Sequence, residues 1–106
     1  MNTACKDGFT PEKESDLGAL RAQLDRIDAE LQTLFERRMA LCGQIGDYKK
    51  EHALAVRDAA REEELLRAVA ARSAAGMADY DAALFRELMA LSRRRQEKLL
   101  GGEEKA

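Results

Sequence analysis

Apolar side chains recur at steps of three and four residues along the first half of the chain. They form an apolar seam made of Leu17, Leu20, Leu24, Ile27, Leu31, Leu34, Leu41, Ile45 and Tyr48. This heptad spacing predicts one long helix, capped by Ser15 or Asp16 and running to about Lys50. Gly43 and Gly46 each cost such a helix about 1 kcal/mol, so we expect another segment to approach its backbone closely there.

Two shorter helices are predicted in the second half of the chain. After a short connection, the second helix is expected from about Arg57 or Asp58 to Ser73, with Gly76 as its C-cap. The third is expected to begin near Asp79 and to run to Leu99 or Leu100, where Gly101 and Gly102 stop it.

The chain has 106 residues, enough for one domain. Hydrophobic residues make up 45% and charged residues 36%, with one proline and 5% aromatics, a mixture typical of amphipathic helices rather than sheets. The predicted fold class is therefore all-α, with three helices per chain, one long and two shorter. We expect residues 1–14 to form a flexible N-terminal arm, residues 15–100 the helical domain and residues 101–106 a disordered C-terminal tail.

The length of the first helix predicts self-association. A helix of about 35 residues is about 52 Å long, whereas a compact chain of this size has a radius of gyration near ~13 Å. The long helix must therefore project beyond any single-chain core and leave its apolar seam in water. Pairing with a second copy buries the seam, so we expect an intertwined homodimeric helical bundle.

Charge and cysteine content exclude several other classes of protein. A net charge of −2 gives no footprint for nucleic acid and no attraction to an acidic membrane surface. No apolar run approaches the roughly 20 residues of a membrane span, and residues 1–10 lack the apolar core of a signal peptide. Cys5 and Cys42 lack His or Cys partners at metal-binding spacing, so we expect no metal and two reduced thiols in a cytoplasmic protein.

Four polar residues stand where the helical pattern favours apolar ones. Arg38 occupies a position of the apolar seam, and Lys49 follows about three turns later on the same face. On the third helix, Leu84, Phe85 and Leu88 form an apolar stripe, and Ser92 and Gln96 continue it toward Leu99. A charge placed within an apolar surface needs a partner, so these residues predict a polar, cation-rich cavity for an anionic ligand.

Each of these residues also has a purely structural interpretation. Arg38 can extend out of the seam with only its stem packed, and Lys49 can be a solvated cation that suits the C-terminal end of the helix dipole. Ser92 and Gln96 can be ordinary, partly exposed helix residues. The three successive arginines at residues 93–95 are expected to form a solvated charged edge.

The start of the second helix carries a charged cluster. Asp58, Arg61 and Glu62 share one face at positions i, i+3 and i+4. Asp58 can equally be the N-cap of the helix, with Glu62 in an acidic first turn, and Arg61 can pair locally with Asp58. The cluster therefore either lines the predicted cavity or serves the helix alone.

Several segments of the predicted helices match one known family. They are Leu20-Arg21, Asp28, Glu36-Arg37-Arg38-Met39-Ala40-Leu41, Ile45-Gly46-Asp47-Tyr48-Lys49, Val56-Arg57-Asp58-Ala59-Ala60-Arg61-Glu62, Leu84-Phe85, Ser92 and Gln96. With these residues the chain resembles the all-helical class of chorismate mutases from Leu17 to about Leu100.

The resemblance implies roles for the cations. Arg21 is similar to the arginine that reaches across the dimer to one substrate carboxylate, and Arg38 to the arginine that binds the other. Lys49 and Gln96 are similar to the pair that hydrogen-bonds the ether oxygen. Arg21 and Arg38 lie 17 positions apart, about 25 Å along one helix, so one small diacid reaches both only if they come from different chains.

The resemblance extends to the acidic cluster and to the third helix. Asp58 and Glu62 are similar to the group that handles the ring hydroxyl, Arg61 to a nearby supporting residue, and Ser92 to a carboxylate contact. The implied activity is the rearrangement of chorismate to prephenate in the biosynthesis of phenylalanine and tyrosine, without a cofactor. The implied catalytic residues are Arg38, Lys49 and Gln96.

Two other functions stay open at this point. The related isochorismate–pyruvate lyase resembles this fold and reuses the arginines, the lysine and the glutamine, but it lacks a matching acidic group on the second helix. Asp58 and Glu62 therefore favour the mutase. A non-catalytic helical dimerisation module, or a regulatory subunit, would favour leucine or alanine in place of Arg38 and Lys49.

Overall fold

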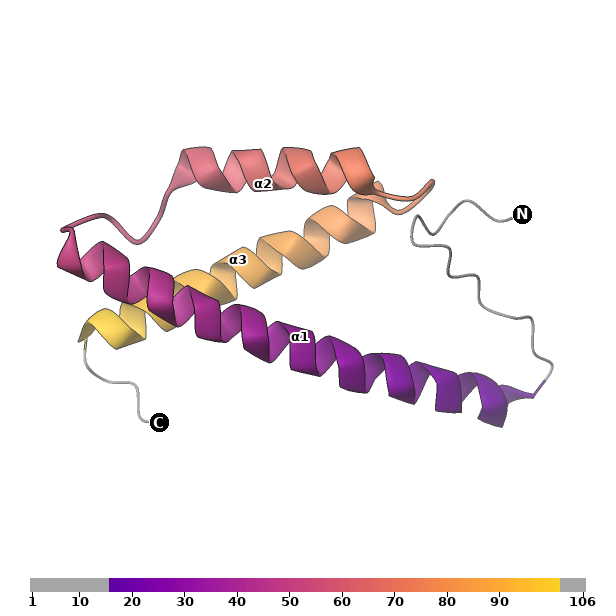
Figure 1. The fold of residues 1–106 in the computed structure, drawn as a ribbon. Coiled ribbons are helices and arrows are strands. Elements are labelled where there is room, and N and C mark those ends of the chain that lie inside the picture. The colour runs from indigo at the N-terminus through magenta and orange to yellow at the C-terminus, as the bar shows by residue number, and fades with distance from the viewer. Residues whose placement is uncertain (1–15, 102–106) are drawn as a thin grey trace.

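The computed structural model describes residues 16–101, which form three helices and no strand. They are α1 (Leu17–Glu51), α2 (Ala59–Arg72) and α3 (Ala78–Gly101) (Figure 1). The predicted all-α class and the division into one long and two shorter helices are confirmed. The predicted N-terminal arm and Cys5 lie outside the described residues. So does the predicted tail, apart from Gly101, which is the last residue of α3.

The starts of the first two helices follow from capping by aspartate. Asp16 caps α1, and its carboxylate accepts a hydrogen bond of 2.9 Å from the backbone nitrogen of Gly18. Asp58 caps α2 in the same way, accepting from the backbone nitrogen of Arg61 at 3.0 Å. These carboxylates satisfy backbone donors that have no partner within the helix.

The end of α2 differs from the sequence-based expectation, because Ser73 rather than Gly76 is its C-cap. The Ser73 hydroxyl donates to the backbone oxygen of Val69 and contacts the carboxylate of Asp81 in α3, both at 2.8 Å. Gly76 lies beyond the cap with a φ of +80°, a conformation that glycine adopts without strain. Its role is to turn the chain into α3, so the prediction of a glycine cap was wrong.

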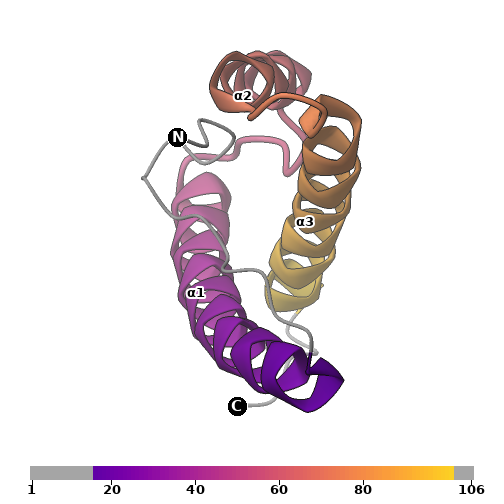
Figure 2. The ribbon, with the colours of Figure 1, turned by 90° about the vertical axis from the view of Figure 1, so that its right-hand side faces the viewer.

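Helix α3 is the centre of the arrangement, because it packs against both α1 and α2 while those two helices do not pack against each other. Helices α1 and α3 run in the same general direction and cross, whereas α2 runs back the opposite way (Figure 1). The end-on view in Figure 2 shows α1 and α3 side by side, with α2 against the N-terminal end of α3. The N-terminal end of α1 projects beyond the other two helices (Figure 1).

One chain buries little apolar surface by itself. Among the described hydrophobic residues only Cys42, Val69 and Met89 are buried. Every residue of the apolar seam on α1 is between 40% and 58% exposed. The radius of gyration is 17.4 Å, against about 13 Å for a compact chain of this length. As expected from the helix length, a single chain leaves its seam uncovered.

Candidate active site

A hollow of about 160 Å³ lies between the C-terminal half of α1, the start of α2 and the C-terminal half of α3. A single water molecule needs only about 10–15 Å³ by the same measure, so the hollow has room for a small organic molecule. We call it the central hollow. Its walls consist of Arg38, Cys42, Ile45, Lys49, Val56, Asp58, Arg61, Glu62, Leu65, Met89, Ser92, Arg93 and Gln96.

The fold brings seven of the eight sequence-predicted site residues to this one place. Those seven are Arg38, Lys49, Asp58, Arg61, Glu62, Ser92 and Gln96. The eighth, Arg21, is exposed near the N-terminal end of α1 and does not line the hollow. Within one chain, the carboxylate-binding pair implied by the resemblance is therefore separated.

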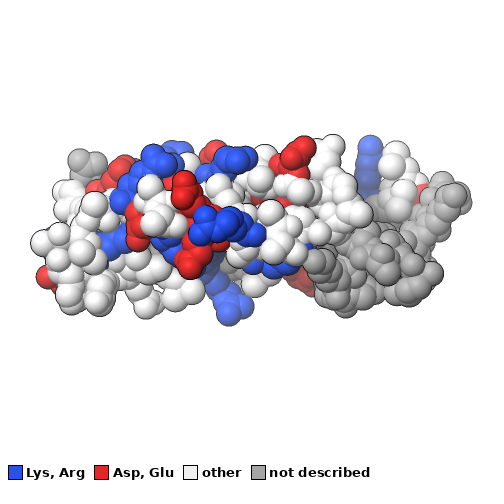
Figure 3. All heavy atoms as spheres, turned by 90° about the horizontal axis from the view of Figure 1, so that it is seen from above, with Lys and Arg blue, Asp and Glu red and all other residues white. Residues whose placement is uncertain are grey.

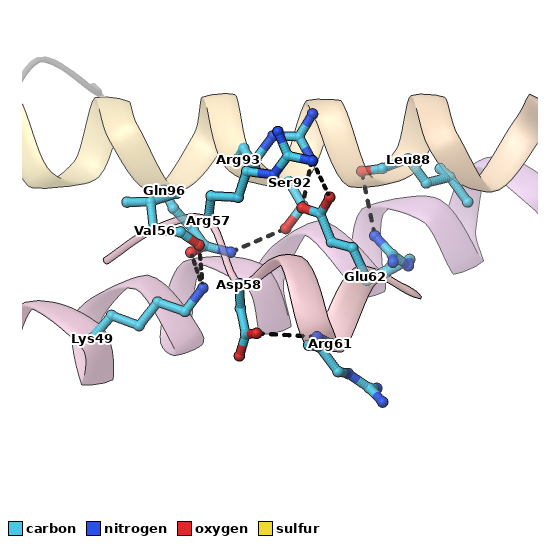
Figure 4. A network of polar contacts seen from close by, with 11 residues as sticks. Lys49, Val56, Arg57, Asp58, Arg61, Glu62, Leu88, Ser92, Arg93 and Gln96 are labelled. Atoms are coloured by element: carbon cyan, nitrogen blue, oxygen red, sulfur yellow. Dashed lines mark hydrogen bonds and ion pairs between the residues drawn. The ribbon is translucent and has the colours of Figure 1, made fainter. Parts of the chain in front are cut away.

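Lys49 on α1 and Gln96 on α3 meet at the wall of the hollow. The Lys49 ammonium donates a hydrogen bond of 3.1 Å to Oε1 of Gln96, and it also donates to the backbone oxygen of Val56 (Figure 4). Because an ammonium group can only donate, the amide oxygen of Gln96 must face Lys49. The amide nitrogen Nε2 then faces Ser92 and donates to its hydroxyl at 3.0 Å. Gln96, only 4% exposed, is therefore held in one defined orientation.

Glycine in α1 makes this meeting sterically feasible. A Cβ atom at Gly46 would lie 3.0 Å from Cγ and 3.4 Å from Cα of Gln96. One turn earlier, a Cβ atom at Gly43 would lie 3.3 Å from a methyl group of Leu99. The predicted close approach at both glycines is confirmed: α3 is the segment that approaches, and it carries Gln96 with it.

Arg38 is half-buried on the wall of the hollow rather than extended into solvent. Its Nη1 donates to the backbone oxygen of Leu88 at 3.5 Å and lies 3.9 Å from the sulfur of Cys42. The ion pairs within residues 16–101 involve neither Arg38 nor Lys49. Two cations thus face one hollow without a carboxylate partner, which is a favourable arrangement for an anionic ligand.

The sequence left open whether Asp58 and Glu62 line the predicted cavity or serve the helix alone. Asp58 is the N-cap of α2, and it also lines the central hollow. Glu62 lies in the first turn of α2, and its side chain is 17% exposed in the wall of the hollow. Capping the helix and facing the cavity are therefore compatible, because the first turn of α2 stands at the cavity edge.

The guanidinium group of Arg61 points away from the central hollow (Figure 4). Its guanidinium pairs with Glu64 at 2.7 Å, and both side chains are largely exposed. The local pairing with the side chain of Asp58 considered above does not occur, since Asp58 accepts only from the backbone nitrogen of Arg61 (Figure 4). Arg61 lines the hollow from its rim.

Sequence reasoning missed Arg93. The prediction of a solvated edge was wrong at this position, because Arg93 is 28% exposed, lines the hollow and forms an ion pair with Glu62. Arg57 contacts the other oxygen of the same carboxylate at 3.6 Å. The available signal was helical spacing. Arg93 follows Met89 by four positions and precedes Gln96 by three, so these three residues lie on neighbouring turns of one side of the helix.

The charge of the site is local. Of the four cationic side chains that line the hollow, Arg61 pairs outside it with Glu64 and Arg93 pairs with Glu62, so Arg38 and Lys49 are the two that form no ion pair within residues 16–101. On the outer face over α2, by contrast, positive and negative side chains are interleaved, and no patch of one sign forms (Figure 3). The unpaired positive charge of the site therefore comes from Arg38 and Lys49 on its wall, and not from a basic patch on this outer face.

Two further features of residues 16–101 bear on the kind of protein. None of the three helices is both long enough and apolar enough to span a lipid bilayer. Within the same residues, no three His, Cys, Asp or Glu side chains come together as a group that could hold a metal ion. Cys42 is a free, buried thiol.

The fold and the site define a class: a small all-helical protein with a hollow between its helices that is lined by charged side chains. Residues 20–97 match the family model described as chorismate mutase type II, and the chain belongs to this all-helical family. The resemblance stated from the sequence is thereby confirmed. No curated protein and no solved structure matches the chain.

Proposed function

We propose that this protein is a cytoplasmic chorismate mutase that converts chorismate to prephenate in the biosynthesis of phenylalanine and tyrosine. The observation that carries the proposal is the hydrogen bond between Lys49 and Gln96 inside a cation-lined hollow. Membership of the chorismate mutase type II family supports it independently.

The reaction asks for positioning and electrostatics rather than for acid–base groups. It is a [3,3] rearrangement within one molecule, in which a C–O bond breaks while a C–C bond forms. No proton is transferred and no covalent intermediate forms, so the enzyme has two tasks. It must hold the flexible side chain of chorismate over the ring, and it must stabilise the negative charge that develops on the ether oxygen.

Lys49 and Gln96 suit the second task. Both present N–H donors at the same end of the hollow, and the bond between them fixes the orientation of the amide. We assign both donors to the ether oxygen, with Lys49 also close to a substrate carboxylate. In a site screened from water, one such donor lowers the barrier by roughly 3–4 kcal/mol.

Arg38 suits the first task, because a guanidinium can grip a carboxylate with two parallel hydrogen bonds. Its present partners are a backbone carbonyl and a thiol, which are weaker than a carboxylate. We assign Ser92 to a further carboxylate contact. Asp58 and Glu62 are assigned to the ring hydroxyl, and Arg61 to a supporting position at the rim.

The second carboxylate requires a second copy of the chain. Arg21 and Arg38 are 17 positions apart on helix α1, about 25 Å along its axis. We propose that two chains pair along the exposed apolar seam as an intertwined homodimer, and that Arg21 of one protomer completes the hollow of its partner. The seam exposes large apolar side chains along the whole of α1, a surface typical of an obligate interface.

Two competing functions are separated by particular residues. An isochorismate–pyruvate lyase of the same fold would not need the carboxylates of Asp58 and Glu62, and both line the hollow here. A non-catalytic dimerisation or regulatory module would not need Arg38 and Lys49 directed at a cavity without carboxylate partners. Both observations favour the mutase.

The direct test is an ultraviolet assay of the purified protein with chorismate, with prephenate identified as the product. Isochorismate is assayed in parallel, with pyruvate as its product. We expect turnover of chorismate alone. Release of pyruvate from isochorismate without prephenate formation would assign the lyase activity. If chorismate is not turned over and does not change the melting temperature, the non-catalytic module is favoured.

A further inference from the structure

The carboxylate of Glu62 is held by two arginines that come from different parts of the chain. Nη1 of Arg93, on α3, pairs with Oε2, and Nη2 of Arg57, just before α2, lies 3.6 Å from Oε1 (Figure 4). The two arginines are not equivalent, because the side chain of Arg57 is 66% exposed and that of Arg93 only 28%. Solvent screens the first contact more than the second, so Arg93 is the stronger partner.

Glu62 needs such a partner for its orientation. It is a flexible side chain, and it shares the wall of the hollow with a second carboxylate, that of Asp58. Two neighbouring carboxylates repel each other, and a poorly solvated charge without a partner is costly. Without Arg93, Glu62 would turn toward solvent and the more exposed Arg57.

The ion pair leaves Glu62 able to bind a ligand. A carboxylate has about four lone-pair sites, and one arginine contact on each oxygen leaves acceptor capacity on both. A hydroxyl group of a molecule in the hollow can therefore donate to Glu62 while Arg93 stays in place. An arginine suits this role better than a lysine, because its planar fork fixes the direction of the carboxylate.

We propose that Arg93 is a positioning residue: it holds Glu62 on the wall of the central hollow as the acceptor for the ring hydroxyl of the substrate. This inference rests on the proposed function, and it adds a residue to recognition of the hydroxyl. Arg93 acts through Glu62 and does not itself bind the substrate. Its neighbour Arg94 lies outside the central hollow, in a separate depression with Met39 and Lys98.

The test compares chorismate with its analogue that lacks the ring hydroxyl, which keeps the bonds that rearrange. For Arg93→Gln we expect kcat/KM for chorismate to fall roughly tenfold, the effect of one lost charge-assisted hydrogen bond. For the analogue we expect wild type and variant to be equal within about twofold. Arg94→Gln, which removes the same charge from the next position of α3, should leave both substrates unchanged.

A double-mutant cycle with Glu62→Gln adds a second readout. If Arg93 acts through Glu62, Arg93→Gln has no further effect on chorismate turnover once Glu62 is replaced. Arg93→Lys keeps the charge without the fork and should recover part of the loss. It also keeps the test open if Arg93→Gln fails to fold.

Several results would overturn the inference. An equal loss for both substrates would mean that Arg93 binds a carboxylate directly or serves the fold alone, and additive effects in the cycle would mean that it acts independently of Glu62. Either result, with an active wild type, refutes the role of Arg93 and leaves the proposed function standing. A wild-type protein that does not turn over chorismate refutes both.

Discussion

Nζ of Lys49 and Oε1 of Gln96 lie 3.1 Å apart, although the two residues are 47 positions apart in the chain. This single hydrogen bond joins α1 to α3 at the wall of the central hollow. It fixes which atom of the amide each neighbour faces: Oε1 accepts from Lys49, and Nε2 donates to the hydroxyl of Ser92.

Replacing Lys49 should therefore damage turnover more than binding. For Lys49→Ala we expect kcat to fall by about a hundredfold or more, because a donor aimed at developing charge acts mainly in the transition state. The matched control is Lys50→Ala, the next residue of α1, which is exposed and does not line the hollow. Steady-state kinetics of both variants check the expectation, and a loss below about tenfold would remove Lys49 from the role.

Gly46 should be intolerant of even one methyl group. In Gly46→Ala the new Cβ would stand 3.0 Å from Cγ of Gln96, so either the side chain or α3 must move. The matched control is Gly43→Ala, one turn away, where the nearest atom is the end of a flexible leucine side chain, 3.3 Å off.

We expect Gly46→Ala to lower kcat by roughly tenfold or more, since a small misplacement of a catalytic group is costly. Gly43→Ala should stay within a fewfold of wild type. Both variants gain helix propensity of about 1 kcal/mol, so thermal unfolding separates an effect on the site from an effect on the fold. Equal activities of the two variants would contradict the assigned contact between Gly46 and Gln96.

Asp58 offers a way to separate its two duties. Asparagine caps a helix about as well as aspartate, whereas alanine loses roughly 1 kcal/mol of stability. We therefore expect Asp58→Asn to keep the melting temperature of wild type and Asp58→Ala to lower it. If the carboxylate takes part in binding the ring hydroxyl, Asp58→Asn still loses activity with chorismate. A fully active Asp58→Asn variant would leave the residue with its capping role alone.

The proposed dimer makes a quantitative prediction for mixed protomers. Arg21→Ala and Arg38→Ala should each be nearly inactive as homodimers, because each lacks one carboxylate anchor in both sites. When the two variants are unfolded together and refolded at equal amounts, half of the dimers are mixed. Each mixed dimer has one intact site, so about a quarter of wild-type activity should return.

The control for this experiment refolds each variant alone. No recovery of activity in the mixture would mean that Arg21 and Arg38 do not serve the same site from different chains. Analytical ultracentrifugation of the wild-type protein checks that it is a dimer, which this experiment assumes. A stable monomer at micromolar concentration would contradict the pairing of the apolar seams.

The sequence predicted the helices well because each depends on local pattern. Heptad spacing and an aspartate cap set α1, whose ends at Leu17 and Glu51 agree closely with expectation. The end of α2 was predicted less well, since a serine hydroxyl that bonds across to Asp81 replaced the expected glycine cap. That bond depends on how α2 and α3 meet, which no local pattern contains.

The same division holds for the site. The periodicity of the sequence and the residue types and spacing of the family motifs were enough to predict seven of the residues that line the central hollow. Only the tertiary structure decided that Arg93 turns inward to Glu62, because this ion pair joins α3 to α2. The angle and distance between packed helices determine which charged side chains can form an ion pair. The sequence alone does not distinguish the successive arginines at residues 93–95, because the position of α2 beside α3 decides which of them reaches Glu62.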